Sequence, residues 1–392
     1  MKEKHSLFKI SQKGLIRSLI FKDVPKFDVF LFISVIFLAT FGTVMIFSAG
    51  EPYAYARYND GAYFIKRQII WLIIGFAAMY ISSHLKPEFY ESLTPIIYIL
   101  TLILLLLVLI IGFVGNGAKR WISIGPLTIQ PSEIAKISIV LMLSKYFSEY
   151  EKLALDKNNR VNIFIYGTLF PIILILIPIV LVMLQKHLSC IIILGLLGLL
   201  MIVVAGVNLR YISICCLGGA LGVSALAIFT DYTKERILVW QNPEAYKLTG
   251  GWQTLQGLMA IGSGGIFGVG LGNSVMKHCY VSEPANDMIY AILCEELGII
   301  GAIFTLLLFG LLIFRGFSIA LKAENVFARL TAFGISMKTA IQVLLNIAVV
   351  TNTIPNTGIS LPFFSYGGSS LIMIFIEMGI LLSISRFSKI TK

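Results

Sequence analysis

Charged side chains are scarce in this sequence of 392 residues. Asp, Glu, Lys and Arg make up 13% of it and apolar residues 57%, whereas soluble domains carry about 25% charged residues. A water-soluble particle of this size could not bury so much hydrocarbon. The composition therefore predicts an integral membrane protein, and it excludes a cytosolic enzyme, a disordered scaffold and a nucleic-acid-binding module.

Cysteine and histidine are also sparse, with five and four copies. The cysteines that lie in apolar runs are Cys190, Cys215, Cys216 and Cys294. They lack metal-ligand spacing and are typical of small buried apolar side chains. No HExxH, CxxC or GxSxG motif occurs, so we predict no metal site, and we do not expect a lone histidine such as His84 or His187 to bind a ligand.

Long apolar segments dominate the sequence instead. A transmembrane helix needs about 20 largely apolar residues, and ten segments fit this description. They are 27–49, 68–85, 95–114, 131–147, 161–185, 188–206, 211–230, 288–314, 326–352 and 361–384. The sequence therefore predicts an all-α integral membrane protein, a bundle of ten transmembrane helices.

The distribution of Lys and Arg predicts the orientation of these spans. With the N-terminus inside, the inner segments carry 19 of the 31 basic residues and the outer segments ten, and cytoplasmic loops usually hold such an excess. We expect both termini in the cytoplasm: a basic segment 1–26, a membrane domain 27–385 and a short tail 386–392. The net charge of +11 is then explained by the anionic inner leaflet rather than by nucleic acid.

One long outer segment, 231–286, separates the seventh and eighth spans. Loops of this length are usually functional or disordered, and this one carries Trp240, Trp252 and an apolar stretch, so we expect it to be ordered. Its glycine-rich run 262–272 lacks the Lys-Ser/Thr of a phosphate loop and is more typical of tight backbone turns. We expect any catalytic site to lie on the outer face.

Two cations and a tryptophan precede the fourth span. Lys119 and Arg120 could hold phosphate, for which the guanidinium fork is well suited, and Trp121 could stack on a sugar or a lipid. The alternative is an interfacial tryptophan with cations that extend toward water.

Several charged residues lie within the predicted spans, where they are costly unless paired. Lys136 follows Glu133 by three residues, which places the two side chains on one helical face. Lys338 has three candidate partners, Glu295, Glu296 and Glu377, of which Glu296 and Glu377 join Glu133, Lys136 and Lys338 as the intramembrane polar set. We interpret these five residues as structural ion pairs or as elements of a transport path.

Asp287 stands where the outer segment meets the eighth span. It could simply cap that helix. It also lies near Lys277, His278 and Glu283 in the sequence, and a carboxylate at such a boundary can be tuned by burial and by neighbouring charges, as a general base requires. Near the tenth span, the Pro-, Gly- and hydroxyl-rich run 357–370 suggests irregular backbone that is buried or lines a cavity.

Together these motifs resemble the SEDS family of shape, elongation, division and sporulation proteins, which includes FtsW, RodA and SpoVE. The motifs that carry the resemblance are Arg120-Trp-Ile-Ser-Ile-Gly, Gln130-Pro-Ser-Glu-Ile-Ala-Lys, Ala260-Ile-Gly-Ser-Gly-Gly, Asp287 with Glu295-Glu-Leu-Gly, and Ser360-Leu-Pro-Phe-Phe-Ser-Tyr-Gly-Gly-Ser-Ser. The resemblance covers nearly the whole chain after residue 26. The run Gln185-Lys-His-Leu-Ser is more similar to the division and sporulation branch.

The resemblance implies a peptidoglycan glycosyltransferase that polymerises lipid II into β-1,4-linked glycan strands at the outer face of the cytoplasmic membrane. It implies Asp287 as the essential base. It also implies as partners the growing glycan strand, a class B penicillin-binding protein and other divisome or elongasome membrane proteins. A divalent cation, Mg²⁺ or Mn²⁺, could share the neutralisation of charge. The candidate substrate-binding residues are Lys119, Arg120, Trp121, Arg236, Lys277, Glu283 and Ser365.

Two other classes of function stay open from the sequence. A ten-span bundle with buried charges could move lipid II across the membrane as a flippase. The chain could also be a non-catalytic scaffold that activates a partner synthase.

Overall fold

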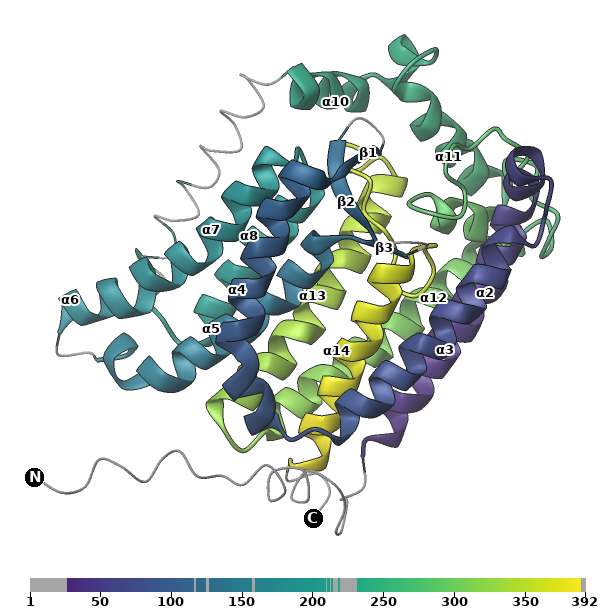
Figure 1. The fold of residues 1–392 in the computed structure, drawn as a ribbon. Helices are drawn as coiled ribbons and strands as arrows, with labels where there is room; N and C mark the ends of the chain where they lie inside the picture. Colours follow the sequence, from purple (N-terminus) through teal and green to yellow (C-terminus); the bar gives the residue numbers. More distant parts are fainter. Residues whose placement is uncertain are drawn as a thin grey trace, which may run out of the picture.

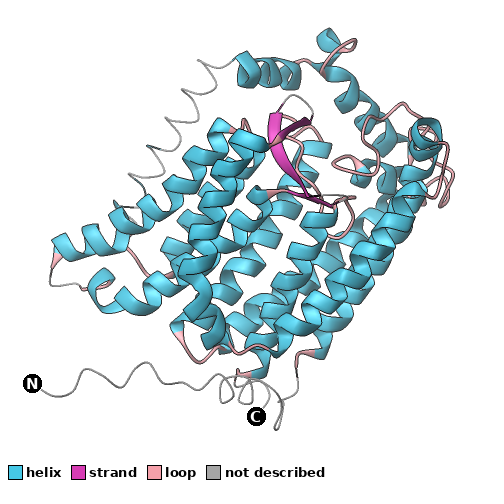
Figure 2. Ribbon diagram, viewed as in Figure 1, coloured by secondary structure: helices cyan, strands magenta, loops and turns pink. Residues whose placement is uncertain are grey.

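The computed structural model describes residues 27–115, 118–124, 127–156, 159–208, 210–211, 213, 218 and 231–388 (Figure 1). Within these residues the chain is mostly helical (Figure 2). Seven helices are long and apolar enough to cross a membrane. They are α2 (Val29–Tyr58), α3 (Tyr63–His84), α4 (Pro87–Ile111), the continuous helix Arg160–Leu184, α12 (Ile289–Lys322), α13 (Val326–Val350) and α14 (Gly368–Arg386). The chain is therefore a multi-pass membrane protein.

Two further predicted spans correspond to helices in the bundle. Segment 131–147 lies in α5 (Pro131–Ala154), which packs against α4, α8 and α13, and segment 188–206 is the 17-residue apolar helix α8 (Leu188–Val204). The helix Arg160–Leu184 is built from α6 (Arg160–Asn162), the π-helical turn η1 (Ile163–Leu169) and α7 (Phe170–Leu184). The predicted span 211–230 lies almost wholly outside the described residues, as do the segment 1–26 and the end of the tail.

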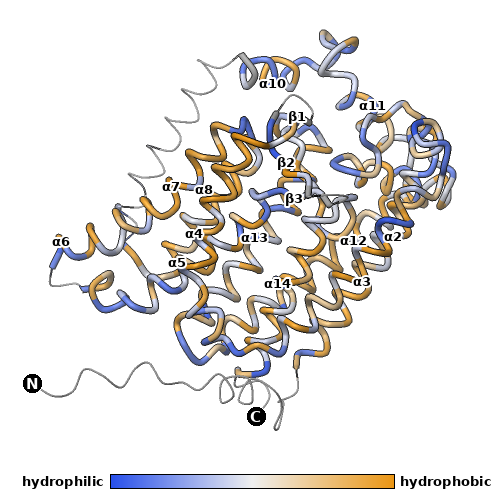
Figure 3. The backbone as a smooth tube through the Cα atoms, in the orientation of Figure 1, coloured by the Kyte–Doolittle hydropathy of each residue, from blue (hydrophilic) through white to orange (hydrophobic). Residues whose placement is uncertain are grey.

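The surface of the bundle suits a lipid solvent. Apolar residues run along its helices, and hydrophilic residues gather at the helix ends and in the connections (Figure 3). Large apolar side chains such as Ile73, Ile110 and Leu307 are 65%, 75% and 66% exposed. Apolar surface spread over whole helices would be unfavourable in water, but it is the surface that a bilayer requires.

One end of the bundle carries the non-membrane elements. There the segment 231–286 folds into α10 (Asp231–Gln241), the short helix η2 (Pro243–Tyr246) and α11 (Gly251–Ser263) (Figure 1). Trp240 Nε1 donates to the carbonyl of Asn352 at 2.9 Å, which fixes the segment to the residues after α13, and Trp252 Nε1 donates to the carbonyl of Tyr280 at 2.8 Å within the segment. This agrees with the expectation of order.

The same end holds a small sheet that the all-α prediction missed. Strands β1 (Phe113–Gly115), β2 (Ala118–Ile124) and β3 (Leu127–Ile129) form an antiparallel sheet in that order. Trp121 and the isoleucines of β2 favour extended backbone, and Ile122 lies opposite Ile129 in the ladder. The strands follow the third apolar run directly and are too short to give a clear alternating pattern.

The glycine-rich run 262–272 packs against an interruption in α12. At Gly298 the backbone has φ 64° and ψ −165°, and a Cβ atom added there would lie 2.4 Å from the amide nitrogen of Gly268. The N–H of Val269 donates to the carbonyl of Glu295 at 3.0 Å. The prediction of tight turns is confirmed, although the sequence did not indicate that these turns meet the eighth predicted span.

The tenth predicted span, 361–384, begins too early. Residues 354–367 are not helical, and α14 starts only at Gly368. Within the irregular stretch Phe363 and Phe364 are 2% and 0% exposed. The expectation of buried irregular backbone is therefore confirmed, and this stretch forms part of the site described next.

Candidate functional site

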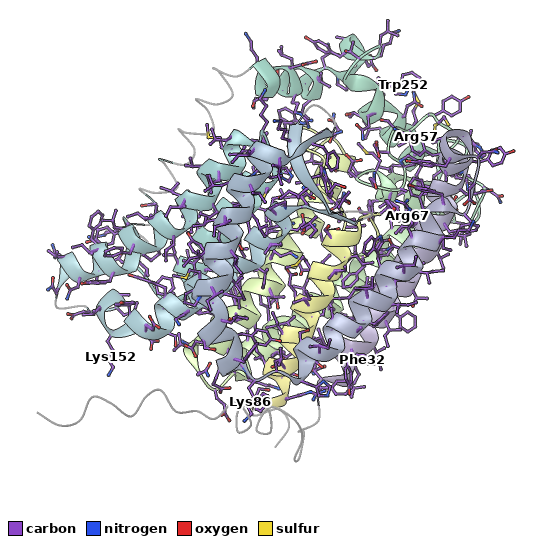
Figure 4. The ribbon with its side chains drawn as sticks, viewed as in Figure 1. Phe32, Arg57, Arg67, Lys86, Lys152 and Trp252 are labelled. Carbon is purple, nitrogen blue, oxygen red and sulfur yellow. The ribbon has the colours of Figure 1, made fainter. Side chains whose placement is uncertain are left out.

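A cavity of about 660 Å³ lies at the end of the bundle that carries the sheet and α11. Side chains from β2, α5, α8, α10 and α11 meet there with the irregular stretch before α14. Figure 4 shows Arg67, one of the lining residues, at the beginning of α3, on the same side of the bundle as Trp252 of α11. From the predicted set, the lining includes Arg120, Trp121, Glu133, Lys136, Arg236, Glu283 and Asp287.

Asp287 is held at this cavity by contacts from three elements. Nε2 of Gln253 on α11 donates to both carboxylate oxygens, at 3.3 and 3.4 Å. Nδ2 of Asn346 on α13 donates to its backbone carbonyl at 2.9 Å. Gly358 lies against the carboxylate, since a Cβ atom added there would be 3.7 Å from Oδ2. The side chain is half-buried and faces the cavity rather than serving as a helix cap.

The surroundings of Asp287 change its affinity for protons. Burial raises the pKa of its carboxyl to about 6, and the negative charge of Glu283 acts in the same direction. The hydrogen bond from Gln253 and the positive charge of Arg236 oppose this rise. A carboxyl with a pKa close to neutrality is ionised at physiological pH and still basic enough to accept a proton.

Three arginines line the cavity. Nη2 of Arg120 donates to the carbonyl of Lys186 at 2.5 Å, and Nη1 of Arg236 donates to that of Asn356. Arg67, which the sequence analysis did not single out, stacks over the ring of Tyr63 with 4.4 Å between its Cζ and the ring centroid. The cavity is therefore suited to an anionic ligand.

Glu283 and Ser365 support the segment that carries Asp287. Nδ2 of Asn286 donates to Oε2 of Glu283 at 2.5 Å. The hydroxyl of Ser365 donates to the carbonyl of Asn286 and accepts from the N–H of Leu361, both at 2.7 Å. Ser365 does not line the cavity, so its contacts position the preceding turn rather than reach a ligand directly.

Two predicted cations lie away from the cavity lining. Lys119 is exposed on β2. Lys277 is only 2% exposed, and its ammonium contacts Oε1 of Glu296 at 3.0 Å and the carbonyl of Gly272 at 2.6 Å. The structure thus places Lys277 inside the protein, because the folded glycine-rich run brings it to α12, and it does not join the other predicted binding residues.

The charged residues that were predicted to lie within the spans form ion pairs inside the bundle. The expected contact between Lys136 and Glu133 is present at 2.8 Å. Lys338 pairs with Glu377 at 2.5 Å, and Glu296 forms its ion pair with Lys277 instead. Glu133 and Lys136 also face the cavity, whereas Lys338 and Glu377 are fully enclosed.

Sequence reasoning missed part of the lining. Gln253 and Arg67 belong to no recognisable motif, Thr357 stands out only as part of the run 357–370, and His187 has no partner residue near it in the sequence. His187 is 8% exposed, and its Nδ1 has no hydrogen-bond partner among the described residues. Burial, together with the positive charges of Arg120 and Lys136, lowers its pKa well below the usual value, so the imidazole is neutral.

The described residues do not build a metal centre, since no group of three or more His, Cys, Asp and Glu side chains among them could hold an ion. A smaller hollow of about 230 Å³ adjoins the cavity and shares Arg236, Gln253 and Asn356 with it. The hollow therefore extends the cavity toward α10.

The sequence matches a family model described as cell cycle protein, FtsW/RodA/SpoVE, over residues 28–390. The chain is 38% identical to the stage V sporulation protein E of Bacillus subtilis over 364 residues, which are 92% of this chain and 98% of that protein. It is 36% identical over 374 residues to a probable peptidoglycan glycosyltransferase FtsW of Geobacter sulfurreducens, with 93% and 96% covered.

Solved structures agree with the sequence relatives. A chain of a complex described as a peptidoglycan synthase that coordinates polymerization and crosslinking superposes with a TM-score of 0.76 at 27% identity, covering 92% of this chain and 98% of that one. The rod shape determining protein RodA of Thermus thermophilus superposes with a TM-score of 0.68 at 27% identity, with 93% and 98% covered. This chain belongs to the FtsW/RodA/SpoVE family.

Proposed function

We propose that this chain is a peptidoglycan glycosyltransferase that polymerises lipid II. The observation that carries the proposal is the cavity in which Asp287, with a pKa of about 6, lies among Arg67, Arg120 and Arg236. The names of its relatives, a sporulation protein and a probable peptidoglycan glycosyltransferase, support it. They also support a role in cell division or sporulation.

We place the reaction at the outer face of the cytoplasmic membrane. In this proposal the chain crosses the membrane ten times, through the seven long apolar helices, α5, α8 and the segment 211–230. The loop 231–286 between the seventh and eighth spans, the sheet and the cavity then lie outside. Both termini, as the segments 1–26 and 386–392, lie in the cytoplasm and flank the membrane domain 27–385, because the basic residues are in excess on that side.

The reaction joins the 4-hydroxyl of one sugar to the anomeric carbon of a lipid-linked chain. In our proposal the Asp287 carboxylate accepts the hydroxyl proton as the new C–O bond forms. The bond from the anomeric carbon to the lipid diphosphate breaks on the opposite side, which inverts the configuration. Diphosphate leaves as an anion, so no acid is required to protonate it, in contrast to the second carboxyl of sugar hydrolases. One essential carboxylate is sufficient.

Cations stabilise the leaving group in this scheme. Arg120 and Arg236 face the cavity, where fixed positive charge stabilises developing negative charge more effectively than it would in water. Trp121 offers an apolar surface for a sugar or a lipid, and Lys119 lies exposed on the same strand, β2. We assign Lys277 a structural role because its charge is already neutralised by Glu296. No group of three or more His, Cys, Asp and Glu side chains in the described part of the chain could hold a metal ion, and no step of this scheme uses Mg²⁺ or Mn²⁺.

A class B penicillin-binding protein is the partner we propose for this chain. One similar structure is a complex described as coordinating polymerization with crosslinking, and a transpeptidase would crosslink the glycan that this chain makes. Other divisome or elongasome membrane proteins would recruit the pair to its site of action.

A reconstituted assay separates this function from its alternatives. The purified chain, with any partner's transpeptidase site blocked, should convert lipid II into glycan polymer. A flippase would move labelled lipid II across vesicles and make no polymer, and a scaffold would make none without an active synthase. The enclosed ion pair of Lys338 and Glu377 has a structural explanation and gives no specific support to transport.

A further inference from the structure

Two buried polar side chains at the cavity have hydrogen-bonding atoms without a partner. These are Nδ1 of His187 and Oγ1 of Thr357, which find none among the described residues. Both side chains line the cavity, and each is only 8% exposed. An unsatisfied buried polar group costs about 1–3 kcal/mol, so such groups usually have a purpose, and a cavity wall is where a ligand can satisfy them.

The two side chains belong to neighbouring parts of the cavity wall. The hydroxyl of Ser189, at the start of α8, donates to the backbone carbonyl of Thr357. Thr357 is followed by Gly358, which lies against the carboxylate of Asp287. The wall therefore continues from His187 through Thr357 to the proposed base.

The end of the cavity at His187 differs in charge from the end at Asp287. At the Asp287 end, the carboxylates of Asp287 and Glu283 offset Arg236. At the His187 end, Lys136 is paired with Glu133, and Arg120, which contacts the carbonyl of Lys186 next to His187, forms no ion pair with any described residue. The start of α8 adds a positive partial charge. This end therefore favours an anion.

We propose that His187 and Thr357 hold a phosphate oxygen of a lipid-linked diphosphate at the end of the cavity lined by Arg120. The imidazole is neutral, so it has one N–H to donate, and the threonine hydroxyl is a second donor. Arg120 supplies the charge. This inference rests on the proposed function, since it gives the diphosphate of the donor sugar a location on the side away from the acceptor hydroxyl that Asp287 deprotonates.

The test measures binding rather than polymerisation. The full chain in detergent is titrated with farnesyl diphosphate, and with farnesol as the uncharged control. The wild type should bind the diphosphate and bind farnesol far more weakly. His187→Phe keeps an aromatic ring but loses both nitrogens, and Thr357→Val keeps the shape but loses the hydroxyl. Each should weaken diphosphate binding about tenfold or more, the cost of a hydrogen bond to a charged group.

Two further variants make the result specific. His278→Ala removes an exposed histidine outside the cavity and should leave binding unchanged. His187→Gln retains a donor and should recover part of the affinity lost in His187→Phe. If His187→Phe does not fold, Thr357→Val decides, because it alters a single hydroxyl. The inference would be overturned if Thr357→Val, or a folded His187→Phe, bound farnesyl diphosphate with wild-type affinity. It would also be overturned if the wild type did not bind farnesyl diphosphate.

The inference and the proposed function can fail separately. If the wild type polymerises lipid II but the two variants bind diphosphate normally, only the inference fails. If the wild type binds diphosphate through His187 and Thr357 but makes no polymer, the binding site stands and the proposed function fails.

Discussion

Lys277 offers a sharp test of the structure, because the sequence and the fold assign it different roles. Its ammonium is buried against Oε1 of Glu296 at 3.0 Å and also contacts Gly272 and Ser48. Lys277→Met would leave the carboxylate of Glu296, which is 0% exposed, without its counter-charge. Breaking a buried ion pair by removing one partner costs about 3–5 kcal/mol, so the variant should unfold much more easily.

The double variant Lys277→Met/Glu296→Gln removes both charges and should recover most of that loss, since residues in one ion pair are energetically coupled. Lys247→Met is the matched control, because Lys247 is exposed, and it should change the free energy of unfolding by less than about 0.5 kcal/mol. Unfolding can be followed by tryptophan fluorescence in detergent.

A Lys277→Met variant with wild-type stability and lost polymerase activity would contradict this prediction. That outcome would show that Lys277 binds substrate directly. Equal stability of the single and double variants would show that the ion pair contributes nothing measurable.

Three further predictions concern the site and its support. The polymerisation rate should fall as pH drops below about 6, since Asp287 acts only when ionised and its pKa is raised from 3.8 to about 6. A pH profile of kcat/KM checks this. A flat profile from pH 5 to 7 would contradict it. Because the folded protein holds this proton more tightly, the stability due to Asp287 is present below pH 3.8 and lost as pH rises through about 6. Gln253→Leu removes a hydrogen bond that lowers this pKa and should move the same limb of the profile to higher pH, while an unmoved limb would show that the bond is unimportant. Gly298→Ala should destabilise the protein by at least about 1 kcal/mol, because an added Cβ would clash with the backbone of Gly268; unchanged thermal unfolding would contradict the observed packing.

The sequence predicted those features that depend on composition or on local spacing. Long apolar runs are sufficient to locate most membrane helices, and the contact of Glu133 with Lys136 follows from a separation of three residues on one helix. Asp287 was predicted to be the catalytic base from its position at the start of a helix and from the resemblance to a family.

Features that depend on packing between distant segments could not be predicted. Lys277 and Glu296 are 19 residues apart in sequence, and only the folding of the glycine-rich run against Gly298 brings them together. His187 has no neighbour in the sequence that indicates a ligand, yet the fold places it beside Arg120. The short sheet gives too few alternating residues to be distinguished from a loop.

In the proposed mechanism, the carboxylate of Asp287 takes the proton from the sugar hydroxyl. The most direct measurement compares glycan synthesis from lipid II by the wild type, by Asp287→Asn and by Glu244→Gln, an exposed carboxylate outside the cavity. We expect polymer from the wild type and from Glu244→Gln and none from Asp287→Asn, although all three proteins should fold and bind farnesyl diphosphate. Polymer synthesis at the wild-type rate by Asp287→Asn would contradict it.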